Sequence, residues 1–302
     1  MRICVYGAGS LGSAIGGMLA EQHDVVLIGR AANVEAIRKS GLELRGIVKK
    51  KVEVEAYPSI DGLAPPDLML ITTKSYNTRA VAEACRDWVN ADTKVLTLQN
   101  GLGNIETLRE WLGQSVICGT TTMGASLASP GIVQIAGVGR TIIGADIDRE
   151  SAVYISSIFR KAGMPSSVER EIDGEVWAKA IVNASINPLT AVLRVANGAL
   201  LESRTTSRLM SEICLECEAV ANAAGIRLPV ASVYKRARAV AQETAHNRSS
   251  MLRDIELGRE TEISSINGHM CLIGARVGVA TPLNRALVAM VESLESRPAE
   301  KG

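Results

Sequence analysis

A glycine-rich hexapeptide placed directly after a short apolar run constrains the fold of this chain more than any other feature. The run is RICVY (residues 2–6), the hexapeptide is Gly7-Ala8-Gly9-Ser10-Leu11-Gly12, and a helical pattern rich in Ala and Gly continues to about residue 21. In such a strand–turn–helix, the first glycine permits the tight turn, the second lets the backbone approach a pyrophosphate, and the third lets the helix pack on the strand. The helix N-terminus then faces the anion. The sequence therefore predicts a dinucleotide-binding site at residues 7–12.

The rest of the first half alternates short apolar runs with helical patterns. The runs lie at 24–28, 68–72, 94–98 and 115–119, and the helical patterns lie near 32–40, 78–90 and 104–112. This alternation is typical of βαβ units and predicts a parallel sheet. Residues 42–57 alternate apolar and charged side chains around Gly46, which predicts a two-sided hairpin. Turn residues at 129–131 and at Gly137 predict antiparallel strands at the edge of the sheet within 124–144.

The character of the sequence changes near residues 165–170, after which it is almost wholly helical in pattern. A chain of 302 residues exceeds the size at which single cores usually stop growing, so two domains are expected. The predicted fold is α/β: an N-terminal Rossmann-like domain with a parallel sheet at 1–168, which binds the cofactor, and an all-helical domain at 169–302, which binds substrate and carries catalysis. The last six residues, 297–302, are expected to fray.

Composition points to a small molecule as the partner. Lys and Arg number 33 against 32 Asp and Glu, and aromatic residues make up 3%, so neither nucleic acid nor an anionic membrane is an expected partner. No apolar run reaches the ~18 residues that a membrane span requires. The six cysteines are scattered through apolar surroundings, which is typical of reduced core residues in a cytoplasmic protein. The three histidines lack ligand spacing, and no metal is expected.

The end of the second predicted strand indicates which nicotinamide cofactor is bound. An Asp or Glu at this point would hold a ribose 2′-hydroxyl, but the strand ends in Ile28-Gly29-Arg30. The guanidinium of Arg30 suits a 2′-phosphate, which favours NADPH over NADH. The alternative for Arg30 is a solvated cation at a strand end.

Two further loops follow predicted strand ends, where open α/β sheets bind ligands. Lys74, in the loop 72–75, is a candidate for contact with the cofactor's phosphates or ribose. Asn100, in the loop 98–104, is a candidate for presenting its amide to nicotinamide or substrate. Because Asn-Gly is also an ordinary turn former, Asn100 has a purely structural alternative.

A polar stripe in the second half is the most informative feature of the chain. Lys179, Asn183 and Asn187 follow one another at four-residue spacing within EIDGEVWAKAIVNASINPLTA (171–191), so each step turns by only about 40° around a helix. Apolar residues occupy nearly every other side, which is typical of a buried helix. An ammonium and two amides buried without partners would cost several kcal/mol on the order-of-magnitude scale for such groups, so the stripe is expected to face a polar cavity; the alternative is an exposed ridge. A lysine so placed can protonate a carbonyl oxygen or stabilise an alkoxide.

A second polar constellation lies at 247–268. Ser249 or Ser250 is expected to cap a helix, and Ser250 and Asp254 share a helix face at i, i+4. Glu262 follows Thr261 and precedes an apolar helical pattern. The pattern leaves two interpretations of Glu262 open, a partner for the dipole of a first helical turn or a carboxylate of the site.

With these residues in view, the chain resembles the ketopantoate reductase family. The resemblance is carried by GAGSLG at 7–12, LQNGLGN at 98–104, WAKAIVNASINPLTA at 177–191, SSMLRDIELGRETEISSING at 249–268 and TP at 281–282. It implies a Rossmann domain followed by a helical domain, with the active site between them. It also implies NADPH-dependent reduction of 2-dehydropantoate to (R)-pantoate, a step of pantothenate and coenzyme A biosynthesis.

The resemblance assigns roles to residues of the second half. Lys179 matches the family's general acid, and Glu262 matches its second catalytic carboxylate, which helps to hold the substrate hydroxyl. Asn183, Asn187 and Ser250 match substrate-binding positions. A reductase of a different branched 2-oxo acid and a non-catalytic nicotinamide sensor are the alternative functions. The sequence is compatible with a homodimer.

The resemblance also extends to the first half and includes one departure. Asn100 matches a position at the junction of cofactor and substrate, and Lys74 and Arg30 match positions that contact NADPH. The family frequently has an Asp–aromatic pair after Thr-Glu-Ile, whereas this chain has Ser264 and Ser265.

Overall fold

The computed structural model describes residues 1–296, and the chain divides into two compact units. The first unit comprises Met1–Gln99 and Asn104–Ile172, and the second comprises Asn100–Gly103 and the chain from Asp173 onward. The division after Ile172 falls slightly beyond the expected boundary at 168, because the strand Ser166–Glu169 still pairs within the first unit. The fraying expected at 297–302 lies outside the described residues.

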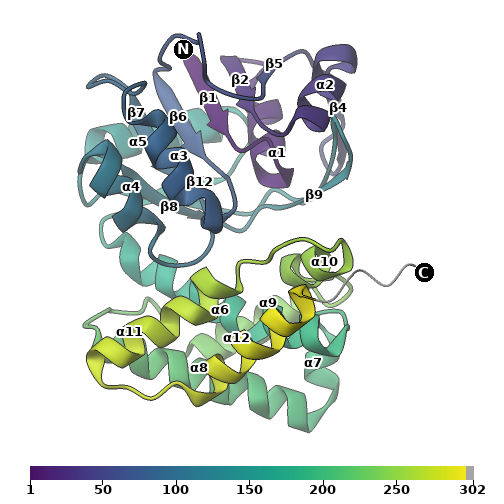
Figure 1. Ribbon diagram of the computed structural model, residues 1–302, viewed down its shortest axis with the longest axis vertical. Helices are drawn as coiled ribbons and strands as arrows, with labels where there is room; N and C mark the ends of the chain where they lie inside the picture. The colour runs from purple at the N-terminus through teal and green to yellow at the C-terminus, as the bar shows by residue number, and fades with distance from the viewer. Residues whose placement is uncertain (297–302) are drawn as a thin grey trace. The chain divides into compact units, whose positions relative to one another are not determined.

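The first unit is built on an eight-stranded sheet in the order β12-β11-β8-β7-β6-β1-β2-β5. Its strands are β1 (Arg2–Tyr6), β2 (Asp24–Ile28), β5 (Glu55–Tyr57), β6 (Leu68–Ile71), β7 (Lys94–Thr97), β8 (Ile117–Thr121), β11 (Thr141–Gly144) and β12 (Ser166–Glu169). The six strands from β5 to β8 pair in parallel, whereas β11 is antiparallel to β8. The order β5-β2-β1-β6-β7-β8 is that of a Rossmann sheet, so the predicted fold class of this half is confirmed (Figure 1).

The sequences of the parallel strands are continuous apolar runs because helices cover both faces of the sheet. In β1, Ile3 and Val5 belong to one buried cluster and Cys4 to another, as expected when alternate side chains point to opposite faces. The covering helices are α1 (Ser10–Leu19), α2 (Ala31–Ser40), α3 (Thr78–Cys85), α4 (Asn104–Leu112) and α5 (Arg149–Lys161). Helices α1, α2 and α5 contribute to the first cluster, and α3 and α4 contribute to the second.

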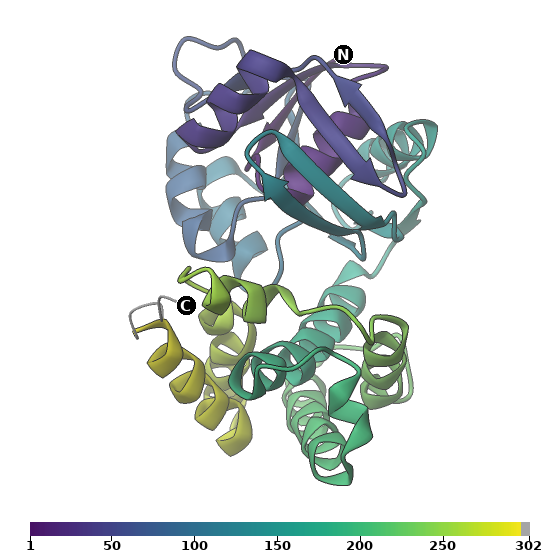
Figure 2. The same cartoon turned by 90° about the vertical axis from the view of Figure 1, so that its right-hand side faces the viewer.

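A second, four-stranded sheet in the order β4-β3-β10-β9 corrects two details of the sequence prediction. Its strands are β3 (Leu42–Gly46), β4 (Lys50–Val52), β9 (Gly124–Ser129) and β10 (Ile132–Gly137). The hairpin predicted for residues 42–57 is present as β3–β4. The last residues of that range form β5 instead, which pairs with β2 in the main sheet. The antiparallel strands expected within 124–144 at the edge of the main sheet are confirmed for β11, because it is antiparallel to β8 and lies next to the edge strand β12. The pair β9–β10 does not extend that edge, because β10 pairs in parallel with β3 instead (Figure 2).

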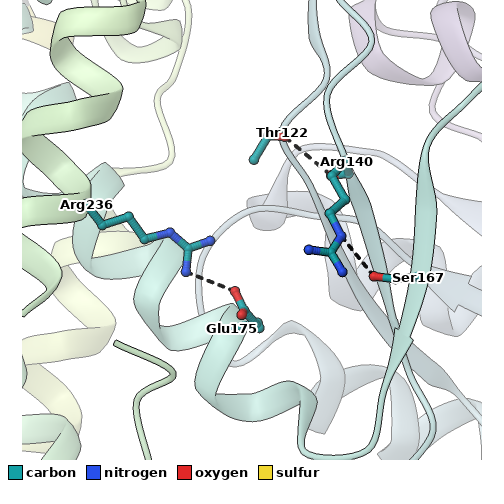
Figure 3. A network of polar contacts seen from close by, with 5 residues as sticks. All are labelled: Thr122, Arg140, Ser167, Glu175 and Arg236. Carbon is teal, nitrogen blue, oxygen red and sulfur yellow. Dashed lines mark hydrogen bonds and ion pairs between the residues drawn. The ribbon is translucent and has the colours of Figure 1, made fainter. Parts of the chain in front are cut away.

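Side chains near the strand β12 secure the last two strands of the main sheet. The Arg140 Nε donates to Ser167 Oγ at 3.0 Å, and Thr122 Oγ1 donates to the Arg140 carbonyl oxygen at 3.3 Å (Figure 3). Helix α5, which the sequence analysis did not predict, begins at Arg149 and is preceded by Asp148, whose carboxylate accepts from the Ser151 N–H at 2.9 Å. This is an ordinary N-cap.

The regular elements described in the second unit are all helical, as predicted. They are α6 (Ile172–Leu193), α7 (Ala199–Glu202), α8 (Arg204–Ala223), α9 (Val233–Glu243), α10 (Ser250–Glu256), the π-helical turn η2 (Ser264–Gly268), α11 (His269–Val277) and α12 (Pro282–Glu295). One buried cluster, which includes Ile181, Ile213, Val220 and Val291, joins α6, α8 and α12. Among residues 1–296, no helix is long and apolar enough to cross a membrane.

All six cysteines are unpaired, and the Cys214–Cys217 pair lies buried on α8. Burial raises the pKa of the Cys214 thiol to about 11 and that of the Cys85 thiol to about 12. Since the thiolate is the reactive form, these thiols are structural. The described residues contain no group of three metal-ligating side chains.

Candidate functional site

The glycine-rich turn lies at the carboxyl end of β1, between β6 and β2. The Gly7 and Ala8 N–H groups donate to the Ile28 carbonyl oxygen at 2.9 and 2.7 Å, and Thr72 Oγ1 donates to the Gly7 carbonyl oxygen at 2.9 Å. Gly7 has φ +121°, and a Cβ there would lie 2.6 Å from the Thr73 nitrogen. A Cβ at Gly12 would overlap the Gly7 carbonyl oxygen. The turn is therefore compatible only with glycine at these two positions.

Gly9 is different, because the protein itself leaves space for a side chain at this position. Its φ of −83° suits any residue, and the nearest atom to a Cβ there is the Gly7 carbonyl oxygen at 4.0 Å. Helix α1 begins immediately afterwards, and the described first turn contains no acidic residue and no side-chain cap. A glycine facing open space at an uncapped helix N-terminus is suited to receiving a pyrophosphate. Ser10 and Leu11 form the first turn of α1, and Ser10 Oγ accepts from the Leu127 N–H at 3.0 Å.

Two cationic candidates follow the neighbouring strands. Arg30 is exposed and precedes α2 directly after β2, and Lys74 is half-buried and precedes the 3-10 turn Ser75–Asn77 after β6. Because β2, β1 and β6 run parallel, the glycine turn, Arg30 and Lys74 all lie at the carboxyl edge of the first unit's sheet. The sheet order reverses between β1 and β6, which is where open α/β sheets bind ligands.

The polar stripe of the second unit lies on α6. Lys179 and Asn183 are half-buried, and Asn187 is 8% exposed. Ile181 and Ile186 beside them are buried in the helical core. These exposures do not fit the alternative of an exposed ridge.

An ion pair holds the carboxylate that precedes the stripe by one turn. Glu175 lies four residues before Lys179, and its Oε2 is 2.9 Å from Arg236 Nη1 on α9 (Figure 3). Both side chains are largely shielded, with exposed fractions of 19% and 29%. The Glu175 carboxylate is therefore paired with the guanidinium of Arg236 on α9.

The loop containing Asn100 belongs by its contacts to the helical unit. The Leu102 N–H donates to the Ser265 carbonyl oxygen at 2.9 Å, and Gly101 and Gly103 have φ values of +86° and +83°. A Cβ at Gly101 would lie 2.8 Å from that same carbonyl oxygen. These glycines therefore permit the loop to approach η2 closely. Ser265, one of the two positions at which this chain departs from the family's Asp–aromatic pair, is the residue whose carbonyl oxygen holds the loop.

This approach brings two candidate residues together. Asn100 Nδ2 lies 3.5 Å from Glu262 Oε2, at the outer limit of a hydrogen bond. Glu262 is only 5% exposed, and its carbonyl oxygen accepts from Ser265 Oγ and the Ile266 N–H, both at 3.0 Å. The Glu262 side chain therefore reaches a residue from a distant part of the sequence, which favours the interpretation as a site carboxylate.

The serine pair at the start of α10 divides into a cap and a candidate ligand. Ser249 caps α10 by accepting from the Leu252 N–H at 3.1 Å, and its Oγ lies 2.7 Å from Thr190 Oγ1 on α6. Ser250 is exposed, whereas Asp254 is buried, so they do not share one environment. Since Thr190 is one turn beyond Asn187, this hydrogen bond ties the N-terminus of α10 to the part of α6 that follows the stripe.

Sequence reasoning did not single out Asn197, although the structure buries it. Its Nδ2 donates to Thr244 Oγ1 at 2.9 Å, and its Oδ1 is a buried oxygen without a hydrogen-bond partner among the described residues. The Asn197 N–H donates to the Asn247 carbonyl oxygen at 3.0 Å, close to Ser250 in the chain. In the sequence, Asn197-Gly198 indicates only a turn.

Comparison with known proteins agrees with this division into two sets of residues. The family model described as Ketopantoate reductase PanE/ApbA matches residues 3–146, and the model of its C-terminal part matches residues 171–295. A 2-dehydropantoate 2-reductase of Pyrococcus horikoshii is 40% identical over 299 residues, which cover 98% of both chains.

Two solved structures extend the similarity to the whole fold. A PanE/ApbA family ketopantoate reductase from Ralstonia eutropha JMP134 has a TM-score of 0.90 at 33% identity, with 98% of each chain covered. A ternary structure of D-mandelate dehydrogenase with NADH and anilino(oxo)acetate has a TM-score of 0.92 at 27% identity, also with 98% of each chain covered. With both family models matched and a relative 40% identical over nearly its whole length, the chain belongs to the ketopantoate reductase family.

Proposed function

We propose that this protein is an oxidoreductase that reduces 2-dehydropantoate to (R)-pantoate with NADPH, a step of pantothenate and coenzyme A biosynthesis. The observation that carries the proposal is the stripe of Lys179, Asn183 and Asn187 on a helix that is otherwise apolar and buried. A protein that only bound a nicotinamide would have no use for this stripe. The names of the relatives, 2-dehydropantoate 2-reductase, support the substrate.

The first unit is the proposed cofactor domain, and the second is the proposed substrate and catalytic domain. Gly7 to Gly12 with the first turn of α1 would hold the pyrophosphate, and Arg30 and Lys74 would hold the adenosine phosphates and ribose. The room at Gly9 fits such a group. A cofactor held by these residues would supply the hydride that the reduction of a keto carbon requires.

The catalytic work of the chain itself falls to the second unit. The Lys179 ammonium donates a hydrogen bond to the keto oxygen of the substrate and transfers a proton to it as the alcohol forms. Asn183 and Asn187 orient the substrate through neutral amide contacts, and Ser250 adds a hydroxyl.

Asn100 and Glu262 complete the proposed site. Glu262 accepts a hydrogen bond from the substrate hydroxyl, and Asn100, beside it, lies at the junction of cofactor and substrate.

Replacement of Arg30 tests the preference for NADPH. We expect Arg30→Ala to lower kcat/KM with NADPH by about 10- to 100-fold, because a charge-assisted contact with the 2′-phosphate is lost. The value with NADH, which lacks this phosphate, serves as the internal control and should change little. An equal loss with both cofactors would contradict the assignment of Arg30.

A comparison of two substrates tests the specificity. We expect the analogue of ketopantoate that lacks the hydroxyl group to react with a kcat/KM lower by about 10- to 100-fold, because buried polar groups of the site then lose their partner. Steady-state kinetics with NADPH measure both values. Equal values would favour a different branched 2-oxo acid as the substrate.

That second candidate also has support among the solved structures. The D-mandelate dehydrogenase structure has a TM-score of 0.92 and contains NADH and anilino(oxo)acetate, so a protein of this fold also binds an oxo acid of another shape. A panel of branched 2-oxo acids with NADPH and NADH distinguishes the two candidates. If cofactor binds but no oxo acid is reduced, the protein is a nicotinamide sensor.

A further inference from the structure

Helix α6 lacks one backbone hydrogen bond in the part that carries the polar stripe. Pro188 lies inside the helix, which continues to Leu193. Proline has no N–H, so the carbonyl oxygen four residues earlier, that of Ala184, loses its helical donor. Ala184 lies directly after Asn183, and Pro188 directly after Asn187. The missing hydrogen bond therefore falls between two of the proposed substrate ligands.

The side chain of Asn267 supplies the missing donor. Asn267 Nδ2, in the turn η2, donates to the Ala184 carbonyl oxygen at 3.0 Å. The same nitrogen donates to Asn284 Oδ1 at 2.8 Å. Asn267 is fully buried, so these contacts are made away from water.

The orientation of both amides is fixed by a carboxylate at the far end of the chain of hydrogen bonds. Glu216 Oε1 on α8 accepts from the Asn284 N–H at 2.9 Å and from Asn284 Nδ2 at 2.8 Å, and its Oε2 accepts from the Leu283 N–H at 3.0 Å. Since a carboxylate and a backbone carbonyl only accept, Asn284 must present its oxygen to Asn267, and Asn267 must present its nitrogen to Ala184. Asn284 therefore donates to Glu216, and Asn267 donates both to Asn284 and to Ala184, so the partners fix the orientation of both side-chain amides.

The remaining atom of Asn267 shows why an amide is kept at this position. Its Oδ1 is buried without a hydrogen-bond partner among the described residues, which costs free energy. An apolar side chain would avoid this cost but would lack both donors. The value of Asn267 to the protein therefore lies in its two N–H groups.

We propose that Asn267 is a positioning residue, which replaces the N–H that Pro188 lacks and so fixes the direction of α6 between Lys179–Asn183 and Asn187. Helices bend readily at proline, so the three proposed ligands remain on one line only if the direction of the helix is held across Pro188. The π-helical form of η2 agrees with a functional role, because single π turns occur frequently at functional sites. The assignment rests on the proposed function, since it concerns the ligands of that substrate.

The test combines Asn267→Leu, which removes both donors at similar volume, with Pro188→Ala, which restores the backbone N–H. For Asn267→Leu we expect a lower melting temperature and a kcat/KM for the oxo acid that is lower by up to about 100-fold, mainly through KM. The KM for NADPH should be unchanged. Adding Pro188→Ala should recover part of both losses, because the backbone N–H restored at position 188 then serves the Ala184 carbonyl oxygen within the helix.

Val291→Ala is the matched control, since Val291 is fully buried on α12 in the same core but lies outside the network. It should lower the melting temperature without raising the substrate KM, and Pro188→Ala should not rescue it. Strictly additive effects of Asn267→Leu and Pro188→Ala on the melting temperature would overturn the proposal, as would an unchanged substrate KM in Asn267→Leu. If the wild type reduces no oxo acid, the proposed function fails, while the stability cycle still decides whether Asn267 repairs the helix.

Discussion

Replacing Lys179 by alanine is expected to lower kcat for the oxo acid by about 10²-fold or more. A positioned general acid typically contributes this factor, and the substitution leaves the keto oxygen without a proton donor or a stabilising cation. Steady-state kinetics with NADPH measure the loss. The affinity for the cofactor, followed by fluorescence titration, should remain at the wild-type value because the proposed phosphate-binding residues, Gly7–Gly12, Arg30 and Lys74, lie in the other unit.

Lys235→Ala provides the matched control for the loss of a positive charge. Lys235 is an exposed lysine on α9 of the same unit, so its removal should leave kcat unchanged. Wild-type turnover in Lys179→Ala would remove the assigned role of Lys179. A loss confined to KM would make Lys179 a binding residue instead of the acid.

Alanine substitutions at two glycines of the same turn are expected to impair different properties, cofactor binding at Gly9 and stability at Gly12. In Gly9→Ala, the new methyl group meets only an atom 4.0 Å away, so the free energy of unfolding should stay near the wild-type value. The cofactor, however, must approach the backbone at this point, and an overpacked contact weakens binding by about tenfold or more. In Gly12→Ala, the methyl group overlaps the Gly7 carbonyl oxygen, which should cost on the order of 3 kcal/mol of stability.

Urea unfolding and fluorescence titration with NADPH, carried out on both variants, separate the two effects. The prediction requires a stable Gly9→Ala that binds poorly and a destabilised Gly12→Ala. Tight cofactor binding by Gly9→Ala would show that no pyrophosphate lies against this glycine. Wild-type stability of Gly12→Ala would show that the turn can relax around a side chain.

The elements that sequence reasoning predicted well are those specified by local pattern. β1, β2 and α4 have the expected bounds or nearly so, because apolar runs and helical periodicity are read within a few residues. The Rossmann order follows from the same βαβ alternation. The predicted helix across the stripe is α6.

The features that the sequence analysis missed depend on contacts between distant residues. The alternation in 124–144 indicates strands, but the pairing of β10 with β3 depends on the whole unit. Asn100-Gly101 indicates a turn, and only the structure shows that it approaches η2 and Glu262. Likewise, the carbonyl oxygen that loses its helical donor at Pro188 accepts from Asn267, which lies far away in sequence, in the block 249–268, where the pattern alone gives no sign of this contact.

The assignment of Asn100–Gly103 to the helical unit means that the backbone passes from one unit to the other at three points: between 99 and 100, between 103 and 104, and between 172 and 173. A single cut after 172 would therefore not divide the chain into its two natural halves. A helical fragment produced in this way would lack the strand-derived loop that meets Ser265. Any hinge between the units must bend three peptide connections together, and Asn100 would travel with Glu262 throughout such a motion.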